Sequence, residues 1–316
     1  MSVTTPPQAA GKPRRPFRRV RLAMSLPEKA LYSFGIRSTK ALCLPDFLII
    51  GAAKAGTTWL AENLDAHPQI FMGKRPGCRD PSEMRYFSQG FGQPLKHYSD
   101  YFRPGQDKIK GDKSPTYSTI SLSRIRFIRR LLPSVRLILF MRNPIERAWS
   151  HAVMNLVKFK GRDVAEVPPS QFYDQFERGQ DQGRYTQILD RWLRVFPEEQ
   201  IYTGLYDEIA SDPLRVLREV CTHIGADTNV DWSRFPYRRV VNEGKRAPMP
   251  DEYRRFLEEM YREEIVRIDE RLGGRVSRWR TAAAAARAIL VTGFSIALSV
   301  APDLMELAAW GFTAAA

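Results

Sequence analysis

The sequence contains little cysteine. Its three cysteines, Cys43, Cys78 and Cys221, are an odd and scattered set in a chain of 316 residues. Their spacing matches no metal-ligand pattern, and their number does not suit a disulfide framework. We therefore expect buried or incidental thiols in a protein of a reducing compartment.

The N-terminal region lacks both acidic residues and an apolar stretch. Residues 1–22 carry six basic residues between Lys12 and Arg21, and prolines interrupt them. Because no hydrophobic segment follows, we expect neither a signal peptide nor an N-terminal membrane anchor here. The segment is typical of a disordered basic arm, which forms part of a lead-in over residues 1–44.

Acidic residues are in the minority in the chain as a whole. Lysine and arginine number 49 against 35 aspartates and glutamates, which gives a net charge of +14. This excess favours anionic partners. It would also suit a non-catalytic basic module that binds a polyanion with steep salt dependence. The length fits a single α/β domain with extensions.

The most informative stretch is residues 46–60, which read DFLIIGAAKAGTTWL. The apolar block at residues 47–50 predicts a buried strand, and an amphipathic helix is expected to begin near Thr57. A strand, a tight loop and a helix N-terminus in succession make an anion site. Unpaired backbone N–H groups and the positive end of the helix point to the same place.

The loop lacks the lysine that the triphosphate-binding motif G-x-x-x-x-G-K-[ST] requires. Gly51 and Gly56 have the correct spacing, but Thr57 occupies the lysine position and Lys54 lies inside the loop. From there its ammonium suits the bridging oxygen of a leaving group. The apolar strand expected at residues 135–140 ends in Met-Arg-Asn-Pro, without a carboxylate for magnesium. We therefore expect an anionic nucleotide that brings no metal, with a metal-dependent nucleoside kinase or NTPase as the alternative.

Four motifs follow one another in an order that resembles one enzyme family. They are KAGTTWL at residues 54–60, E-x-x-YF at 83–87, DKSPTY at 112–117 and RNP-x-x-RA-x-S at 142–150. Together they resemble the sulfotransferases that use 3'-phosphoadenosine 5'-phosphosulfate, most closely the heparan-sulfate-type and bacterial branch. The resemblance covers about residues 46–280.

The resemblance assigns Glu83 the role of the general base that takes the proton from the acceptor. The other interpretation is a solvated loop glutamate, which Tyr86 and Phe87 at the family spacing make less favourable. Residues 84–87 read as a brief strand. Lys113, expected at the end of another short strand, would help neutralise the sulfuryl group or the acceptor, or would be an ordinary surface lysine.

The resemblance also implies how the first loop binds the nucleotide. Lys54, the helix N-terminus and the hydroxyls of Thr57 and Thr58 would stabilise charge on the bridging oxygen. Trp59 either stacks on adenine, as in the small-molecule branch, or belongs to the core. The loop contacts expected to the nucleotide are Lys54, Ala55, Gly56, Thr57, Thr58 and Trp59.

A second anion contact is expected after the strand at residues 135–140. Asn143 is a natural helix N-cap and Pro144 suits the first helical position. Ser150 falls on the Asn143 face of this helix, so Ser150 and Arg142 can converge on one anion. The family uses these positions for the 3'-phosphate. The alternative for Arg142 is an ion pair with a helix carboxylate.

A glycine-bearing basic loop at residues 240–250 resembles the late loop that folds over the nucleotide in this family. Lys245 and Arg246 would be its phosphate contacts, and the alternative is an ordinary basic surface loop. His67, just ahead of a proline at a helix end, is expected to be a capping or packing residue.

The remaining pattern alternates strands with helices. It predicts a P-loop-like, mostly parallel sheet flanked by helices in a single domain, with right-handed crossovers. The strand ends after residues 50 and 140 are expected to be neighbours in one crevice. Helices are expected at residues 58–66, 121–132, 171–178, 184–196, 212–224 and 250–272, and a further strand at 201–206.

The last segment, residues 281–316, differs from the family pattern. Residues 282–301 are almost wholly apolar apart from Arg287, and a proline follows. We expect an interfacial or hairpin membrane helix, a span, or a helix packed on a partner, with the basic arm reinforcing contact with anionic lipid. The protein is then cytoplasmic, and peripheral on or anchored to the inner membrane. A glycan, glycolipid or small alcohol acceptor remains open, and no nucleic-acid partner is expected.

Overall fold

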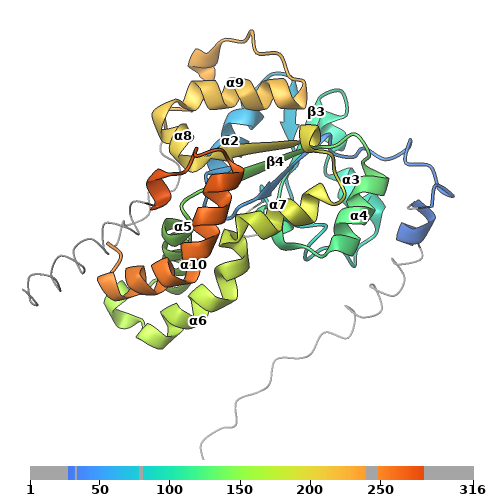
Figure 1. Cartoon of the computed structure of the whole chain (residues 1–316). Coiled ribbons are helices and arrows are strands. Elements are labelled where there is room, and N and C mark those ends of the chain that lie inside the picture. The colour runs from blue at the N-terminus through green and yellow to red at the C-terminus, as the bar shows by residue number, and fades with distance from the viewer. Residues whose placement is uncertain (1–27, 33, 78–80, 240–247, 281–316) are drawn as a thin grey trace, which may run out of the picture.

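The computed structural model describes residues 28–32, 34–77, 81–239 and 248–280, and Figure 1 shows the whole chain. The basic arm, Cys78, the apolar tail and the loop residues Lys245 and Arg246 lie outside the described residues. The expectations for those segments therefore stay predictions.

The centre of the domain is one five-stranded sheet in the order β2-β3-β1-β4-β5. Each neighbouring pair of strands is parallel. All five residues of β1 are buried, as is usual for a strand with helices on both faces. The strands are β1 (Phe47–Gly51), β2 (Ile70–Met72), β3 (Ile109–Lys113), β4 (Arg136–Met141) and β5 (Ile201–Leu205). The predicted parallel sheet is confirmed, including the adjacency of β1 and β4.

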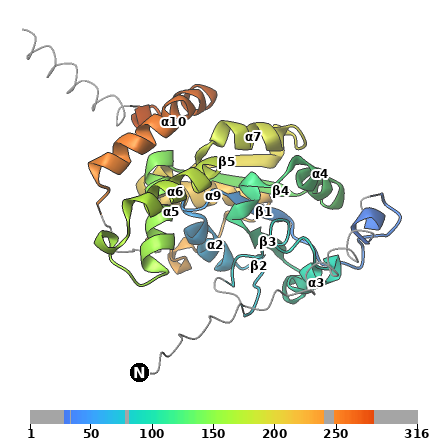
Figure 2. The ribbon, with the colours of Figure 1, turned by 90° about the horizontal axis from the view of Figure 1, so that it is seen from below.

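Helices cover both faces of this sheet. In Figure 1, α2 and α9 lie above it and α3, α4 and α7 lie below it. A separate group made of α5, α6 and α10 packs together at one side, as Figure 2 shows from below. The helices are α2 (Thr57–Asp65), α3 (Leu95–Asp100), α4 (Leu122–Leu131), α5 (Pro144–Val153), α6 (Pro169–Gly179), α7 (Tyr185–Leu193), α8 (Tyr206–Ser211), α9 (Pro213–Ile224) and α10 (Asp251–Arg271).

Local signals in the sequence determine where several helices begin and end. The Asn143 side chain accepts a hydrogen bond from the Ile145 amide at 3.0 Å, so the predicted N-cap of α5 is confirmed. Gly225 has a φ of 78° and ends α9, because a residue with a Cβ is strained in that conformation.

One predicted strand is wrong. Residues 84 and 85 have no regular secondary structure, residues 86 and 87 begin a turn, and only Glu83 pairs with the sheet, as an isolated parallel bridge to Lys113. Arg85 has a φ of 52°, which a strand does not tolerate. Phe87 packs edge-on against Tyr98 and Tyr117, at ring centroid distances of 5.3 and 5.4 Å. Packing of the apolar side chains therefore replaces strand pairing here.

The expected packing residues are buried. His67 is 1% exposed, and its Nε2 lies 2.9 Å from the Asp227 carbonyl oxygen. Cys43 and Cys221 are free thiols, and burial raises the pKa of Cys221 to about 12. Among the helices of the described ranges, none combines the length and apolar character that crossing a bilayer requires.

Candidate functional site

The loop between β1 and α2 is held in a tight left-handed conformation. Lys54 has a φ of 72° and Gly56 has a φ of 89°. A Cβ on Gly56 would lie 2.7 Å from Cδ1 of Ile209, in addition to the conformational strain. The loop therefore lies directly against α8, and glycine is required at position 56. Ala55, between the two, is fully buried.

Lys54 holds a half-buried positive charge near two other cations. Its Nζ lies 3.6 Å from Sδ of Met154, and no ion pair to it occurs within the described ranges. Burial, followed by repulsion from Lys158 and Arg142, lowers the pKa of the Lys54 ammonium. An anion bound at this point would compensate the charge, as the sequence predicted for the loop.

Lys113 ends β3 and reaches the first turn of α2. Its side chain is fully buried, and its Nζ lies 3.5 Å from Oγ1 of Thr58. The strand register places Lys113 beside Ile49 of β1, next to the anion-binding loop. The interpretation of Lys113 as a surface lysine is therefore wrong, because a side chain with no exposed area is not on the surface.

Glu83 lies against the end of β3. Its backbone pairs with Lys113 as an isolated bridge, and its carboxylate forms an ion pair with Arg85. Only 15% of the Glu83 side chain is exposed, so it is not a solvated loop glutamate. The carboxylate and the buried ammonium of Lys113 thus belong to two segments that meet at the carboxyl end of the sheet.

A buried carboxylate that the sequence analysis left unassigned, Asp112, lies beneath this junction. It is fully buried and accepts hydrogen bonds from the hydroxyls of Ser114 at 2.6 Å, Tyr98 at 2.6 Å and Tyr117 at 2.9 Å. Burial raises the pKa of Asp112 to about 6, although the three hydrogen bonds oppose the shift. The signal that could have identified it was its place in the DKSPTY motif at residues 112–117.

The same hydroxyls hold the segment that carries Glu83. Oγ of Ser114 accepts a hydrogen bond from the Arg85 amide at 2.7 Å. The Tyr117 hydroxyl accepts one from the Phe87 amide at 3.2 Å. Both hydroxyls donate their hydrogen to Asp112, so their oxygen lone pairs are free to accept from the two backbone amides. The buried carboxylate thus orients the hydroxyls, and the hydroxyls in turn position residues 83–87.

Arg142 follows β4 and approaches the first loop. Its Nη1 lies 3.5 Å from the Lys54 carbonyl oxygen, and its guanidinium lies over the Tyr206 ring at 4.7 Å. The nearest carboxylate, Glu146, is 3.9 Å away, which is a long ion pair that leaves the N–H groups available for a phosphate. The Tyr185 hydroxyl donates to the Arg142 carbonyl at 2.7 Å and steadies the backbone there.

Two other predicted residues, Ser150 and Trp59, have different surroundings. Ser150 is half-buried on α5. Arg147, on the same face, is 1% exposed and donates to the Gly179 carbonyl at 3.0 Å. Trp59 is 6% exposed and its indole N–H donates to the Tyr237 carbonyl at 3.0 Å. Trp59 thus lies in the core, and its stacking on adenine stays a prediction, as do the nucleotide contacts of Ser150.

Tyr206 and Tyr185 were not singled out from the sequence as supports of the anion site. They come from α8 and α7, and tertiary packing alone brings them to the end of β4. The same holds for Gln182, whose Oε1 accepts from the Ala53 amide of the loop at 3.3 Å. No local pattern marks such residues, because each acts on a segment distant in sequence.

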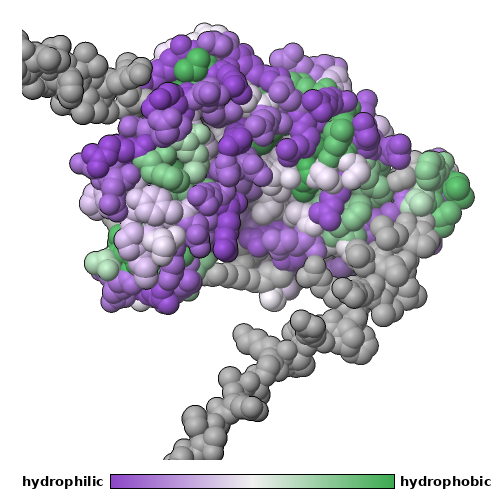
Figure 3. Space-filling model, turned by 60° about the horizontal axis from the view of Figure 1, so that its bottom comes forward, coloured by the Kyte–Doolittle hydropathy of each residue, from purple (hydrophilic) through white to green (hydrophobic). Residues whose placement is uncertain are grey.

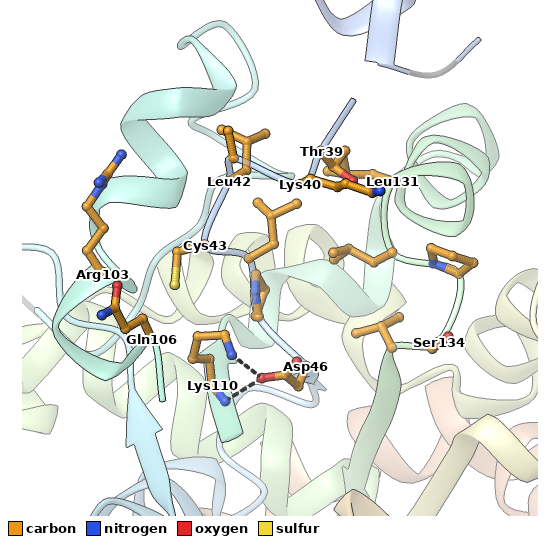
Figure 4. Close-up of a pocket in the computed structure, with 16 residues that line it drawn as sticks. Thr39, Lys40, Leu42, Cys43, Asp46, Arg103, Gln106, Lys110, Leu131 and Ser134 are labelled. Atoms are coloured by element: carbon orange, nitrogen blue, oxygen red, sulfur yellow. Dashed lines mark hydrogen bonds and ion pairs between the residues drawn. The ribbon is translucent and has the colours of Figure 1, made fainter. Parts of the chain in front are cut away.

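A cavity of about 550 Å³ lies at the opposite edge of the sheet, by the amino ends of β1 and β3 (Figure 4). The ion pair between Lys110 and Asp46, at 2.7 Å, lies on its floor, and Cys43 and Arg103 line one side. Ligands of parallel α/β sheets bind at the carboxyl ends of the strands, where the predicted residues are gathered. This cavity is therefore separate from the candidate site.

Comparison with known proteins identifies the family of the chain. A family model described as "Sulfotransferase domain" matches residues 44–243. The bifunctional heparan sulfate N-deacetylase/N-sulfotransferase 1 of Caenorhabditis briggsae is 30% identical over 210 residues, which are 61% of this chain and 23% of that protein. The heparan sulfate glucosamine 3-O-sulfotransferase 3A1 of Mus musculus is 28% identical over 209 residues, which are 62% of this chain and 49% of that protein. This chain thus spans less than half the length of either relative.

A solved structure supports the fold independently. The sulfotransferase from Alicyclobacillus acidocaldarius superposes with a TM-score of 0.59 at 23% identity, covering 75% of this chain and 99% of that one. The superposed part includes most of this chain, so the two proteins share the fold. With the family model matching well over half of the sequence, the chain belongs to the sulfotransferase domain family.

Proposed function

We propose that this protein transfers a sulfuryl group from 3'-phosphoadenosine 5'-phosphosulfate to a hydroxyl or amine acceptor. The observation that supports this most is the approach of two cationic groups at the carboxyl ends of β1 and β4. Lys54 is half-buried without a carboxylate partner in the described ranges, and the charge of Arg142 acts on its ammonium. Nη1 of Arg142 lies 3.5 Å from the backbone carbonyl oxygen of Lys54. Two anionic groups of one nucleotide fit such a pair.

The residues present fit this nucleotide. The α2 N-terminus follows Gly56 and is directed at the loop, so its free N–H groups suit one phosphoryl-type group. Arg142 has N–H groups available for a second phosphate, such as the 3'-phosphate. We propose Ala55, Thr57, Thr58, Trp59, Ser150, Lys245 and Arg246 as further contacts.

The residues around the junction of β1 and β3 suit in-line transfer. The nucleotide supplies the sulfuryl group and a phosphate leaving group. Glu83, oriented by Arg85, takes the proton from the acceptor. Lys54, Lys113 and the Thr58 hydroxyl stabilise the negative charge that develops during transfer. No step in this scheme uses a metal ion.

We propose a glycan as the acceptor class, because both relatives described above carry heparan sulfate in their names. A glycolipid or a small alcohol is an alternative, and the surface loops decide among them. We place the catalytic domain at residues 45–280 in the cytoplasm, with a peripheral membrane attachment. This localisation rests on the basic arm, the apolar tail and the few thiols.

The test has two parts: a comparison of nucleotide binding and an assay of sulfuryl transfer. 3'-Phosphoadenosine 5'-phosphate should raise the melting temperature without magnesium, and ADP should raise it much less. Transfer of label from the ³⁵S-labelled donor to a panel of desulfated glycans, glycolipids and alcohols then identifies the acceptor. Magnesium-dependent ATP hydrolysis would favour a nucleoside kinase or NTPase instead. Salt-sensitive polyanion binding without preference for the 3'-phosphate would favour a non-catalytic module.

A further inference from the structure

The exposed apolar side chains of the described residues are concentrated in one place. Phe34 and Ile36 are each 72% exposed, and Leu31 is 39% exposed. The other large apolar side chains of comparable exposure in the described ranges are Phe159 and Val266, at 41% and 38%. Leu31, Phe34 and Ile36, called the apolar tip below, therefore form a local patch and are not scattered surface residues.

The backbone presents this tip outward in a closed turn. The Phe34 amide donates to the Ala30 carbonyl at 2.9 Å, and the Ile36 amide donates to the Leu31 carbonyl at 3.0 Å. Tyr32, only 8% exposed, anchors the segment to the core. The segment, blue in Figure 1, projects from the right-hand side of the molecule, and the same side carries a hydrophobic area in Figure 3. Exposure of the tip is thus a property of the fold.

Arginines surround the apolar tip. The guanidinium carbon of Arg130 lies 5.8 Å from the centre of the Phe34 ring, and that of Arg37 lies 5.5 Å from the centre of the Tyr32 ring. Arg126 is exposed one turn before Arg130 on α4, a helix that contains four arginines and no acidic residue. Within the described ranges, none of these three arginines forms an ion pair with a carboxylate. The tip therefore combines apolar side chains with uncompensated positive charge.

We propose that the apolar tip and its flanking arginines form a docking surface for an anionic lipid bilayer. The apolar side chains would enter the interfacial region of the bilayer, while Arg37, Arg126 and Arg130 stay at the level of the headgroup phosphates. A protein partner fits less well, because a stable interface covers roughly 800 Å² on each side. Three apolar side chains on a projecting turn offer much less area than that.

The position of the tip is compatible with nucleotide binding on the membrane. Arg130 lies near the C-terminal end of α4, which leads into the amino end of β4, whereas Arg142 follows the carboxyl end of that strand. The tip and the candidate site are therefore at opposite ends of the sheet, and a docked domain keeps its nucleotide site open to solvent. This inference concerns described residues of the lead-in that pack on the catalytic domain, and it does not depend on the basic residues 12–21, the tail or the proposed reaction.

Hydrogen exchange of the full-length chain tests the inference, because it reads out the tip separately from any binding by the arm or the tail. Amides of residues 31–37 should exchange more slowly when vesicles of phosphatidylcholine and phosphatidylserine are added, and should be unaffected by pure phosphatidylcholine vesicles. Unchanged exchange at residues 31–37 with anionic vesicles would overturn the inference, even if the protein bound the vesicles elsewhere. Protection that appears without vesicles as protein concentration rises would assign the tip to a second copy and equally overturn it.

A matched set of variants sharpens the test. In the double variant Phe34→Ser/Ile36→Ser, the anionic vesicles should protect the amides of the tip less from exchange. The partition coefficient of the protein between solution and these vesicles should fall roughly 10-fold or more, because two large apolar side chains no longer enter the bilayer. Val266→Ser, on α10, changes an exposed apolar residue away from the tip and should leave both values unchanged. 3'-Phosphoadenosine 5'-phosphate should raise the melting temperature equally in the wild type, the double variant and Val266→Ser. Failure of the docking inference is therefore distinguishable from failure of the proposed reaction. Equal effects of the two substitutions would contradict a role specific to the tip.

Discussion

Glu83 and Lys113 pair through their backbones as an isolated parallel bridge at the end of β3. The bridge brings a carboxylate and a buried ammonium from separate segments to one edge of the sheet. It is short because Arg85, two residues later, leaves the extended conformation with a φ of 52°. The geometry suits a base that needs a defined position but must stay accessible to an acceptor.

Replacing Glu83 by glutamine should remove the base and leave the nucleotide site intact. We expect kcat to fall about 10²- to 10⁴-fold, because glutamine cannot accept the proton. The dissociation constant of 3'-phosphoadenosine 5'-phosphate, measured by calorimetry, should change little. Glu263→Gln, whose side chain is 80% exposed on α10, is the control and should keep normal turnover. Near-normal turnover of Glu83→Gln would mean that another group is the base.

Arg142→Ala should weaken binding of the nucleotide that carries a 3'-phosphate. A charge-assisted arginine bond contributes about 1.5 to 3 kcal/mol, which corresponds to roughly 10- to 150-fold in affinity. Binding of ADP, which lacks that phosphate, should change much less. Arg178→Ala provides the control, since that side chain is 81% exposed on α6. Equal losses for the two nucleotides would show that Arg142 does not read the extra phosphate.

The ammonium of Lys54 predicts a pH dependence of nucleotide binding. Burial, Lys158 and Arg142 lower its pKa below the usual 10.5 in the free protein, and a bound anion favours the charged form and raises it again. Affinity should therefore fall as the pH rises through the lowered pKa. Binding should take up a proton in the alkaline window between the free and bound values.

Calorimetry in two buffers of different ionisation enthalpy measures this proton uptake directly. Lys54→Arg keeps the positive charge but does not titrate in this range, so its binding should show no such linkage. Proton uptake of the same size in wild type and Lys54→Arg would assign the linkage to a different group.

The sequence predicted the sheet and the motifs better than the supports of the site. The strand at Phe47–Gly51 and the cap at Asn143 depend on neighbouring residues, so local patterns were sufficient. The ring of Tyr206 beneath Arg142 depends on α8, which lies far along the chain. Residues 84–87 were mistaken for a strand because Phe87 packs against Tyr117 and Tyr86 stacks on Tyr98, so these side chains do not alternate across a sheet.

Asp112 provides a prediction about stability as well as rate. Burial raises its pKa from 3.8 to about 6, so between these values the folded state binds more protons than the unfolded state. Its contribution to stability should therefore decrease as the pH rises across this window, which is opposite in sign to that of a salt-bridged aspartate. Denaturant unfolding at several pH values measures the slope, and Asp112→Asn should remove it.

Asp112→Ala should act differently, because it leaves the hydroxyls of Ser114, Tyr98 and Tyr117 without their shared acceptor. We expect a loss of about 2 to 5 kcal/mol of unfolding free energy, measured in denaturant. If Asp112 positions the Glu83 segment through Ser114, kcat should fall while nucleotide affinity is kept, and Asp112→Asn should restore part of the rate. If Asp112→Ala lowers the free energy of unfolding but leaves the kcat of the folded protein unchanged, Asp112 has a purely structural role. Lost packing lowers the fraction of folded protein, but it does not change the turnover number of the molecules that remain folded.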